Sequence, residues 1–449
     1  MVSDGLRRSI GLRDLTLGVI GSVIGSGIFL VPGGVLAQAQ HSIGLSLLVW
    51  FGGGLLTLIG ALTYSELGAM NPGTGGLYLY LRDAFGRLPA FLYGWAMFLA
   101  ISAGAIAVLT SVSAQYIGRV VPLSPIGTRL VTLGLIAGLT VVNVRGTALS
   151  VRFMSLATAV KVAALAFLII ALPLTAGLGA FQGAIWPDHF DLGVLQGFGA
   201  GMLMVLWAYE GWQYSTFIAG EVTDPQRNLP LGLAMGALAL IVIYVLTNVA
   251  YLSALGPAAV ASTTTVAADA VAATFGPGPA ALITIPILIS MISAAHFVVL
   301  SSSRVYFAMA QDGLFFARFA EVHPRYGTPA AAIVGASVAG AALAMIGTVG
   351  QLLGYVVFVG WIFYGLGALA LFRQRRIQPD AVRPYRVPGY PVLPALFVVA
   401  AVALVANTLA SQPPLHSAAA LGLLGLGIPV YLGWQRYRPM GKPGPSSTH

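Results

Sequence analysis

The chain has 449 residues, of which 58% are hydrophobic and only 8% are charged, and its mean hydropathy is +0.89. This composition excludes a soluble globular protein. The absence of cysteine excludes disulfide bonds and thiol chemistry, and the net charge of +9 raises the question of a nucleic acid partner.

Apolar stretches about as long as a bilayer is wide recur along the whole chain. The segment before the first of them is polar and contains arginine, and no cleavage site follows it, so we expect no removable signal peptide. Twelve stretches are predicted to cross the membrane, which places both termini on the same side. They are residues 15–37, 44–69, 86–118, 126–143, 152–176, 193–219, 231–255, 277–310, 329–348, 351–372, 391–411 and 416–435.

The basic residues are distributed unequally between the two sides of these spans. One side carries only two of them, Arg119 and Arg129, together with Asp188, Asp191 and Asp269. The positive-inside rule therefore predicts that the other side, with both termini, is cytoplasmic, and it explains the net charge without nucleic acid. The residues on that side are Arg7, Arg8, Arg13, Arg82, Arg87, Arg145, Arg152, Arg227, Arg318, Arg325, Arg373, Arg375, Arg376, Arg383, Arg386, Arg436, Arg438 and Lys442.

The first span is apolar but makes a poor continuous helix, because glycines crowd into residues 18–34 and Pro32 lies among them. We interpret Gly25-Ser-Gly27 as a break. Unpaired backbone groups at membrane depth are tolerated where they line a cavity. The N–H groups of the half-helix that begins near Ser26 suit a carboxylate, and the carbonyls near Val23 suit an ammonium group. A glycine-rich packing face is the alternative, and this stretch alone does not decide between them.

A second interruption is predicted in the sixth span, where Glu210-Gly211 lies between Trp207 and Trp212. An ionisable residue near the bilayer centre costs about 2.5–3.5 kcal/mol on insertion scales and normally faces a cavity. Broken helices at corresponding positions of two halves indicate a transporter binding site. Ordinary packing in the span is the alternative for the aromatic residues.

Lys161 is another charged residue inside a predicted span. Either its long side chain extends so that the ammonium group reaches the cytoplasmic surface, or the side chain faces the break in the first span, where the ammonium group would bond the exposed carbonyls. In the second case it occupies the space of a sodium ion, and it is also able to titrate.

His296 in the eighth span is equally consistent with packing and with a ligand contact, and without a second ligand at helical spacing it predicts no metal site. Tyr244 and Asn248 lie one helical turn apart and can reach a cavity. The sequence has no P-loop, no glycine-rich dinucleotide turn after a strand, no HExxH and no nucleophile elbow. We therefore expect neither an enzyme nor a cofactor.

An ordered set of motifs resembles the amino acid–polyamine–organocation superfamily, and within it the bacterial relatives of the L-type amino acid transporters. The resemblance covers nearly the whole chain. It implies an all-α membrane protein of twelve helices in the leucine-transporter-type fold, with a five-plus-five inverted repeat, broken helices 1 and 6, and two extra C-terminal helices. The halves are expected at residues 1–180 and 181–373, followed by 374–449. The motifs are Gly25-Ser-Gly-Ile-Phe29, Tyr64-Ser-Glu-Leu-Gly68 with Pro72 and Gly75-Gly76, Trp207-Ala-Tyr-Glu-Gly-Trp212, Ser302-Ser-Arg304 with Asp312-Gly313, and His323-Pro-Arg-Tyr-Gly-Thr-Pro329.

The resemblance also implies roles for single residues. The substrate carboxylate is expected on the backbone of Ser26, Gly27 and Ile28, and the amino group near the carbonyls of Val23 and Trp207. Trp207 matches the aromatic gate, and Lys161 matches the lysine that replaces sodium, with Gly21 as its carbonyl partner and Tyr244 in the same network. The predicted substrate site comprises Val23, Gly25, Ser26, Gly27, Ile28, Trp207, Ala208, Glu210 and Gly211, and the predicted coupling or gating residues are Lys161, Gly21, Tyr244, Trp207 and His296.

The implied function is sodium-independent exchange of small neutral L-amino acids by alternating access in the cytoplasmic membrane. Proton-coupled symport through Lys161 or Glu210 stays open, as do, less favoured, transport of cationic amino acids, a passive channel and a non-transporting sensor. His296 departs from the asparagine of eukaryotic relatives, and Glu210 replaces a small residue of several of them. Those relatives bond a partner glycoprotein through a cysteine, which this chain lacks, so we expect it to work alone as a monomer.

Overall fold

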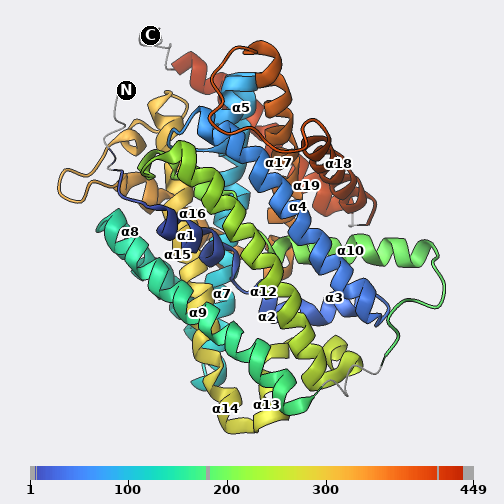
Figure 1. Cartoon of the computed structure of the whole chain (residues 1–449). Helices are drawn as coiled ribbons and strands as arrows, with labels where there is room; N and C mark the ends of the chain where they lie inside the picture. Colours follow the sequence, from blue (N-terminus) through green and yellow to red (C-terminus); the bar gives the residue numbers. More distant parts are fainter. Residues whose placement is uncertain (1–5, 7, 178–182, 412–413, 438–449) are drawn as a thin grey trace.

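The computed structural model describes residue 6 and residues 8–177, 183–411 and 414–437, and the regular structure in this part of the chain is helical apart from one β-bridge between Ile10 and Val222 (Figure 1). The first half contains α1 (Leu12–Val23), α2 (Gly27–Leu30), α3 (Pro32–Gln38), α4 (Ile43–Met70), α5 (Leu77–Phe85), α6 (Arg87–Ala96), the π-helix η1 (Met97–Ile101), α7 (Ser102–Val120), α8 (Pro125–Val144) and α9 (Thr147–Ala176).

The second part of the chain continues the helical pattern. It contains α10 (Leu192–Ala208), α11 (Tyr214–Phe217), the 3-10 helix η2 (Ala219–Glu221), α12 (Pro225–Ser262), α13 (Val266–Phe275), α14 (Pro277–Leu282), α15 (Thr284–Gln311), the 3-10 helix η3 (Ala317–Ala320), α16 (Ala330–Ile346), α17 (Val349–Ile377), α18 (Val392–Ser411) and α19 (Pro414–Tyr437).

Ten described helical segments are long and apolar enough to cross a membrane. The spans expected at residues 193–219 and 329–348 correspond instead to the shorter apolar helices α10 and α16. Helix α10 is short because it stops at Ala208, before the second expected break. The boundary expected between residues 180 and 181 lies outside the described residues, as do Arg7, Arg438 and Lys442.

The first expected break lies between α1 and α2. The N–H of Gly25 donates to the carbonyl of Val23 (2.7 Å), two residues back, and not to a helical partner four residues back. Pro32, which has no N–H to lose, then starts α3. The expected membrane span is therefore a succession of three helices.

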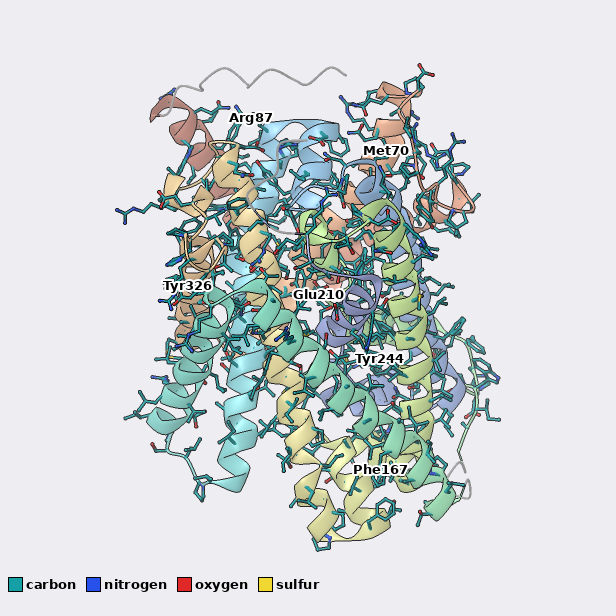
Figure 2. The ribbon with its side chains drawn as sticks, turned by 60° about the vertical axis from the view of Figure 1, so that its left-hand side comes forward. Met70, Arg87, Phe167, Glu210, Tyr244 and Tyr326 are labelled. Atoms are coloured by element: carbon teal, nitrogen blue, oxygen red, sulfur yellow. The ribbon has the colours of Figure 1, made fainter. Side chains whose placement is uncertain are left out.

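The helices around this break come from distant parts of the chain. Helix α12 packs on α1, α4 and α9, and α15 packs on α1, α7 and α9. In Figure 2, Met70 and Arg87 lie at one end of the molecule and Phe167 lies near the other, with Glu210 and Tyr244 between them. The fold thus brings the second break and its neighbours to the middle of the bundle.

Candidate functional site

The two breaks face each other at backbone distance. A Cβ atom added to Gly27 would lie 2.4 Å from the Cα of Ala208, so only glycine permits this approach. Gly211 has a φ of +122°, and its carbonyl accepts the Ser22 hydroxyl at 3.1 Å. The helix is thus interrupted at residues 24–26 and at 209–213, as predicted, and the two interruptions pack together.

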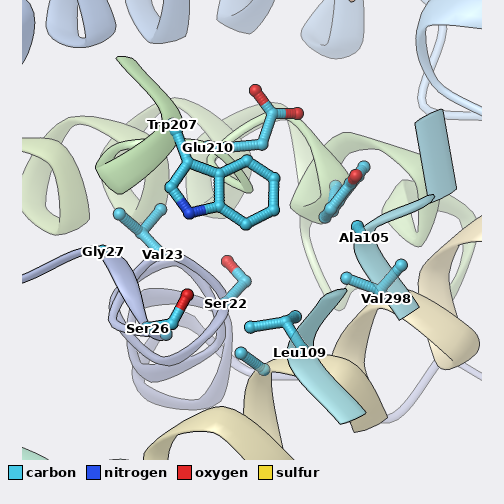
Figure 3. Close-up of a pocket in the computed structure, with 12 residues that line it drawn as sticks. Ser22, Val23, Ser26, Gly27, Ala105, Leu109, Trp207, Glu210 and Val298 are labelled. Atoms are coloured by element: carbon cyan, nitrogen blue, oxygen red, sulfur yellow. The ribbon is translucent and has the colours of Figure 1, made fainter. Parts of the chain in front are cut away.

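A small cavity lies between the breaks (Figure 3). Its volume is about 20 Å³, enough for on the order of one water molecule. Apolar side chains of α7 and α15, such as Leu109 and Val298, form one side, and Trp207 and Glu210 form the opposite one. An amino acid needs these walls to move apart, so binding here requires a conformational change.

The first break offers unused hydrogen-bond donors to this cavity. Within the described residues, the N–H groups of Ser26, Gly27 and Ile28 donate to no carbonyl, and the first N–H to bond back is that of Phe29, which donates to the carbonyl of Ser26. The Ser26 hydroxyl is buried, lines the cavity and has no partner. These donors converge at a helix N-terminus, which favours an anionic group.

The carbonyls expected to receive an ammonium group already have partners. The Tyr244 hydroxyl lies 3.0 Å from the carbonyl oxygens of both Val23 and Ala208, and the Val23 oxygen also accepts the Gly25 N–H. The Trp207 carbonyl accepts the Glu210 N–H at 3.0 Å. The acceptor side of the site is therefore closed by the protein's own donors, with Tyr244 bridging the two breaks.

Lys161 of α9 is fully buried and bonds the first break directly. Its Nζ atom donates to the carbonyls of Gly21 and Ile24, both at 2.8 Å, and lies 3.3 Å from that of Ser290. The Ser290 hydroxyl donates to Ile24 and Gly25. The ammonium group is thus enclosed by carbonyl oxygens in place of solvent.

Glu210 lies at the edge of the cavity but points into a hydrogen-bond cluster. Its Oε1 atom accepts from the hydroxyl of Tyr364 on α17 and from the side-chain amide of Gln213, each at 2.5 Å. Figure 3 shows its carboxylate on the far side of the Trp207 ring from Ser26. This carboxylate connects the second break to α17.

His296 does not reach the cavity. It is buried on another face of α15, where its Nδ1 atom lies 3.0 Å from the side-chain nitrogen of Asn143 and its ring packs on Phe153. The neighbouring turns of α15 supply Ala294 and Val298 to the cavity instead.

Several site residues were missed by sequence reasoning. Ser290, Gln213, Tyr214 and Tyr364 all contact the breaks or line the cavity. Their signal is weak, because single polar or aromatic residues in apolar spans also occur as packing residues. The spacing of Ser290 and Ala294 by one helical turn is the one pattern that would place this serine on the cavity face of α15.

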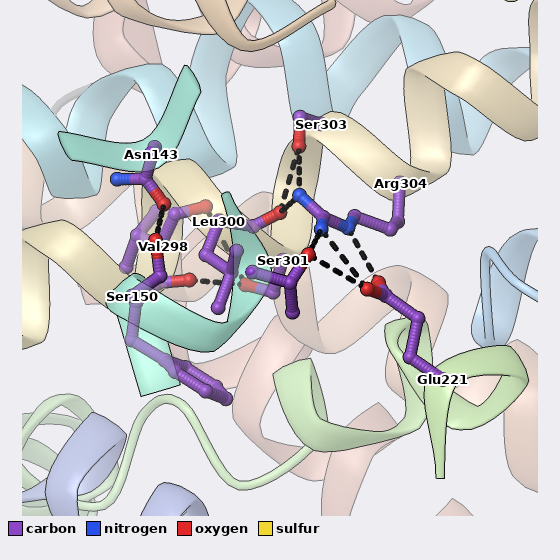
Figure 4. Close-up of polar contacts among 10 residues, drawn as sticks. Asn143, Ser150, Glu221, Val298, Leu300, Ser301, Ser303 and Arg304 are labelled. Carbon is purple, nitrogen blue, oxygen red and sulfur yellow. Dashed lines mark hydrogen bonds and ion pairs between the residues drawn. The ribbon is translucent and has the colours of Figure 1, made fainter. Parts of the chain in front are cut away.

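Arg304 and Glu221 form a buried ion pair (Figure 4). Arg304 of α15 donates to Glu221 at 2.9 Å and to the hydroxyl of Thr147 at the start of α9. The Glu221 carbonyl also accepts the N–H groups of Ser9 and Ile10, just before α1. Glu221, which follows the second break in the chain, therefore links α9, α15 and the residues just before α1. The described residues contain no group of three His, Cys, Asp or Glu able to hold a metal.

Comparisons with known proteins match most of the sequence. A family model described as amino acid permease covers residues 10–426. The serine/threonine exchanger SteT of Bacillus subtilis is 32% identical, over 96% of this chain and 98% of its own length. The large neutral amino acids transporter small subunit 2 of Homo sapiens is 31% identical over 96% of this chain and 81% of its own length. The b(0,+)-type amino acid transporter 1 of Mus musculus is 29% identical over 92% and 84%, respectively.

Proposed function

Because the chain belongs to the amino acid permease family of the amino acid–polyamine–organocation superfamily, we propose that it is a sodium-independent exchanger of small neutral L-amino acids that works by alternating access. Amino acid transport across a membrane, and not catalysis, is the activity of this family. The observation that supports the finer proposal best is the packing of two helix breaks around one small cavity.

The substrate carboxylate binds the free N–H groups of Ser26, Gly27 and Ile28, with the Ser26 hydroxyl beside them. Charge-assisted hydrogen bonds of this kind are about twice as strong as neutral ones. The ammonium group binds the carbonyl side, at Val23 and Trp207. There it takes over the place of the Tyr244 hydroxyl, so that substrate binding releases a link between the two breaks.

Sodium independence is supported by the position of Lys161. Its ammonium group already supplies a positive charge to the carbonyls of Gly21 and Ile24. A bound sodium ion would meet the same oxygens and would be repelled by the lysine. The positive charge at the end of α1 therefore belongs to the chain and does not have to be bound and released in each cycle.

The residues that line the cavity favour a small neutral side chain once the walls have moved apart. Ala105, Leu109, Ala294 and Val298 offer it apolar contacts and little room. A basic side chain would need a free carboxylate, but that of Glu210 is held by Tyr364 and Gln213. The relative from Bacillus subtilis is named as an exchanger of serine and threonine, which are small and neutral.

The proposed architecture completes the ten long helices with α10–α11 and α16 to give twelve crossings. Two inverted halves, residues 1–180 and 181–373, rock around the breaks, and residues 374–449 add two helices. The arginine-rich end faces the cytoplasm. The chain has no cysteine and therefore forms no disulfide with a partner subunit, and we propose that it works as a monomer.

Proton-coupled symport is the second candidate, because Glu210 and Lys161 are buried titratable groups at the two breaks. Purified protein in proteoliposomes distinguishes the two. Exchange predicts uptake of labelled serine only when the lumen holds unlabelled amino acid. Uptake into empty liposomes that follows an inward proton gradient would replace exchange by symport, and sodium stimulation would refute the proposed role of the lysine.

A further inference from the structure

The helices α1, α9 and α12 pack against one another (Figure 1). A groove outside the breaks is lined by the first turns of α1 and by residues of α9 and α12. Its volume is about 730 Å³. Leu12, Leu17, Leu156, Ala159 and Met235 supply most of its walls. Leu156 and Met235 are 69% and 50% exposed, so the groove opens toward the surroundings of the bundle and not into its core.

Two arginines stand at this groove. Arg13 lines it directly, and Arg152 lies three, four and seven residues before Ser155, Leu156 and Ala159, on the same face of α9. Both are exposed, and within the described part of the chain neither guanidinium group contacts a carboxylate. The carboxylate of Asp14 is nearby and lies 3.4 Å from the Ser155 hydroxyl, which leaves the mouth of the groove with a net positive charge.

We propose that this groove binds an anionic phospholipid from the leaflet at the arginine-rich end. An acyl chain lies along the apolar walls, and the phosphate group bonds Arg13 and Arg152. A guanidinium group matches a phosphate with two parallel hydrogen bonds. The groove has an apolar interior and an unpaired cationic mouth at the end of a membrane helix, which is the complement of such a lipid and not of a soluble anion.

A lipid bound in this groove would also act on the first break, at the end of α1. The lipid contacts α1 and α9, the two helices that Lys161 connects through the carbonyl of Gly21. A lipid packed against Leu12 and Leu17 therefore supports the position of α1 from outside, while Lys161 holds its far end from inside. This consequence rests on the proposed exchange, whereas the binding of the lipid does not.

Native mass spectrometry of the purified chain tests the binding, with phosphatidylglycerol and phosphatidylcholine of the same acyl composition as probes. Phosphatidylglycerol should bind more tightly than phosphatidylcholine. The double variant R13Q/R152Q should lower the affinity for phosphatidylglycerol about 25-fold, because each arginine near a membrane surface contributes about 1 kcal/mol, or about fivefold. A159W, which fills the groove, should lower the affinity for both lipids. The matched controls are R325Q/R376Q, which removes two exposed arginines on the predicted cytoplasmic side, and A403W on the exposed face of α18.

Equal binding of the two lipids by the unmodified chain would overturn the proposal, as would equal losses in the variants and their controls. Exchange in proteoliposomes provides the second readout. It should rise severalfold when phosphatidylglycerol replaces phosphatidylcholine in the unmodified chain and should lose this dependence in R13Q/R152Q. Selective binding without this dependence would leave the site standing and refute its effect on α1.

Discussion

Replacing Lys161 with alanine should reduce exchange by about 30-fold or more. The substitution removes the ammonium donor from the carbonyls of Gly21 and Ile24. Ile24 keeps the Ser290 hydroxyl as a partner, but the Gly25 N–H that would cap Gly21 in a regular helix donates to Val23 instead. A buried carbonyl without a partner costs about 1–3 kcal/mol, and a loss of about 2 kcal/mol corresponds to a rate about 30-fold lower.

The assay is exchange of labelled serine in preloaded proteoliposomes, with equal amounts of monodisperse protein. Ser290→Ala is the matched control, because it removes a neutral hydrogen bond to the same Ile24 carbonyl and should lower exchange by only about fivefold. Partial rescue of the Lys161→Ala variant by sodium would agree with a cation-sized space between the carbonyls. More than half of the unmodified activity in Lys161→Ala would refute the reasoning.

Three further substitutions test other parts of the account. Trp207 separates the substrate cavity from a second apolar cavity of about 260 Å³. Trp207→Ala should therefore join the two cavities and let leucine and phenylalanine compete with serine. Unchanged competition would contradict the role of Trp207 as a wall between them. Gly27→Ala should lower exchange at least 100-fold because its Cβ meets the facing backbone, whereas Gly134→Ala on α8, with no atom within 4 Å, should leave it unchanged; similar losses would contradict the close approach. Glu221→Gln leaves the Arg304 charge unpaired, and removing one partner of a buried ion pair lowers stability by about 3–5 kcal/mol. The unfolding temperature in detergent should therefore fall by several degrees. An unchanged unfolding temperature would show that the pair is dispensable.

The breaks were predictable because two apolar spans are interrupted by residues that weaken a membrane helix. Gly25 and Gly27 weaken the first span at positions two residues apart, and Glu210 places a charge where a lipid-facing helix does not tolerate one. Lys161 was predictable as a partner for the same reason, since a buried ammonium group needs acceptors and the first break supplies carbonyls.

The walls of the site were less predictable, because hydropathy does not tell which face of an apolar helix meets the cavity. Ser290 shares its span with Arg304, which pairs with Glu221, and Tyr364 shares its helix with Arg375, which pairs with Glu66, so polarity alone does not single out the site residues. His296 has the polarity of a site residue, but Asn143 satisfies one of its ring nitrogens on the other side of α15. The Tyr244 bond to the Val23 carbonyl also depends on how α12 packs on α1, which follows from the tertiary structure alone.

Competition by substrate fragments tests most directly whether the two breaks hold both ends of an amino acid. Labelled serine exchange is measured against excess serine, ethanolamine, which lacks the carboxylate, and 3-hydroxypropanoate, which lacks the ammonium group. Serine alone should inhibit, because each fragment leaves one set of backbone groups without a partner. Inhibition by either fragment at the concentration at which serine inhibits would contradict the account.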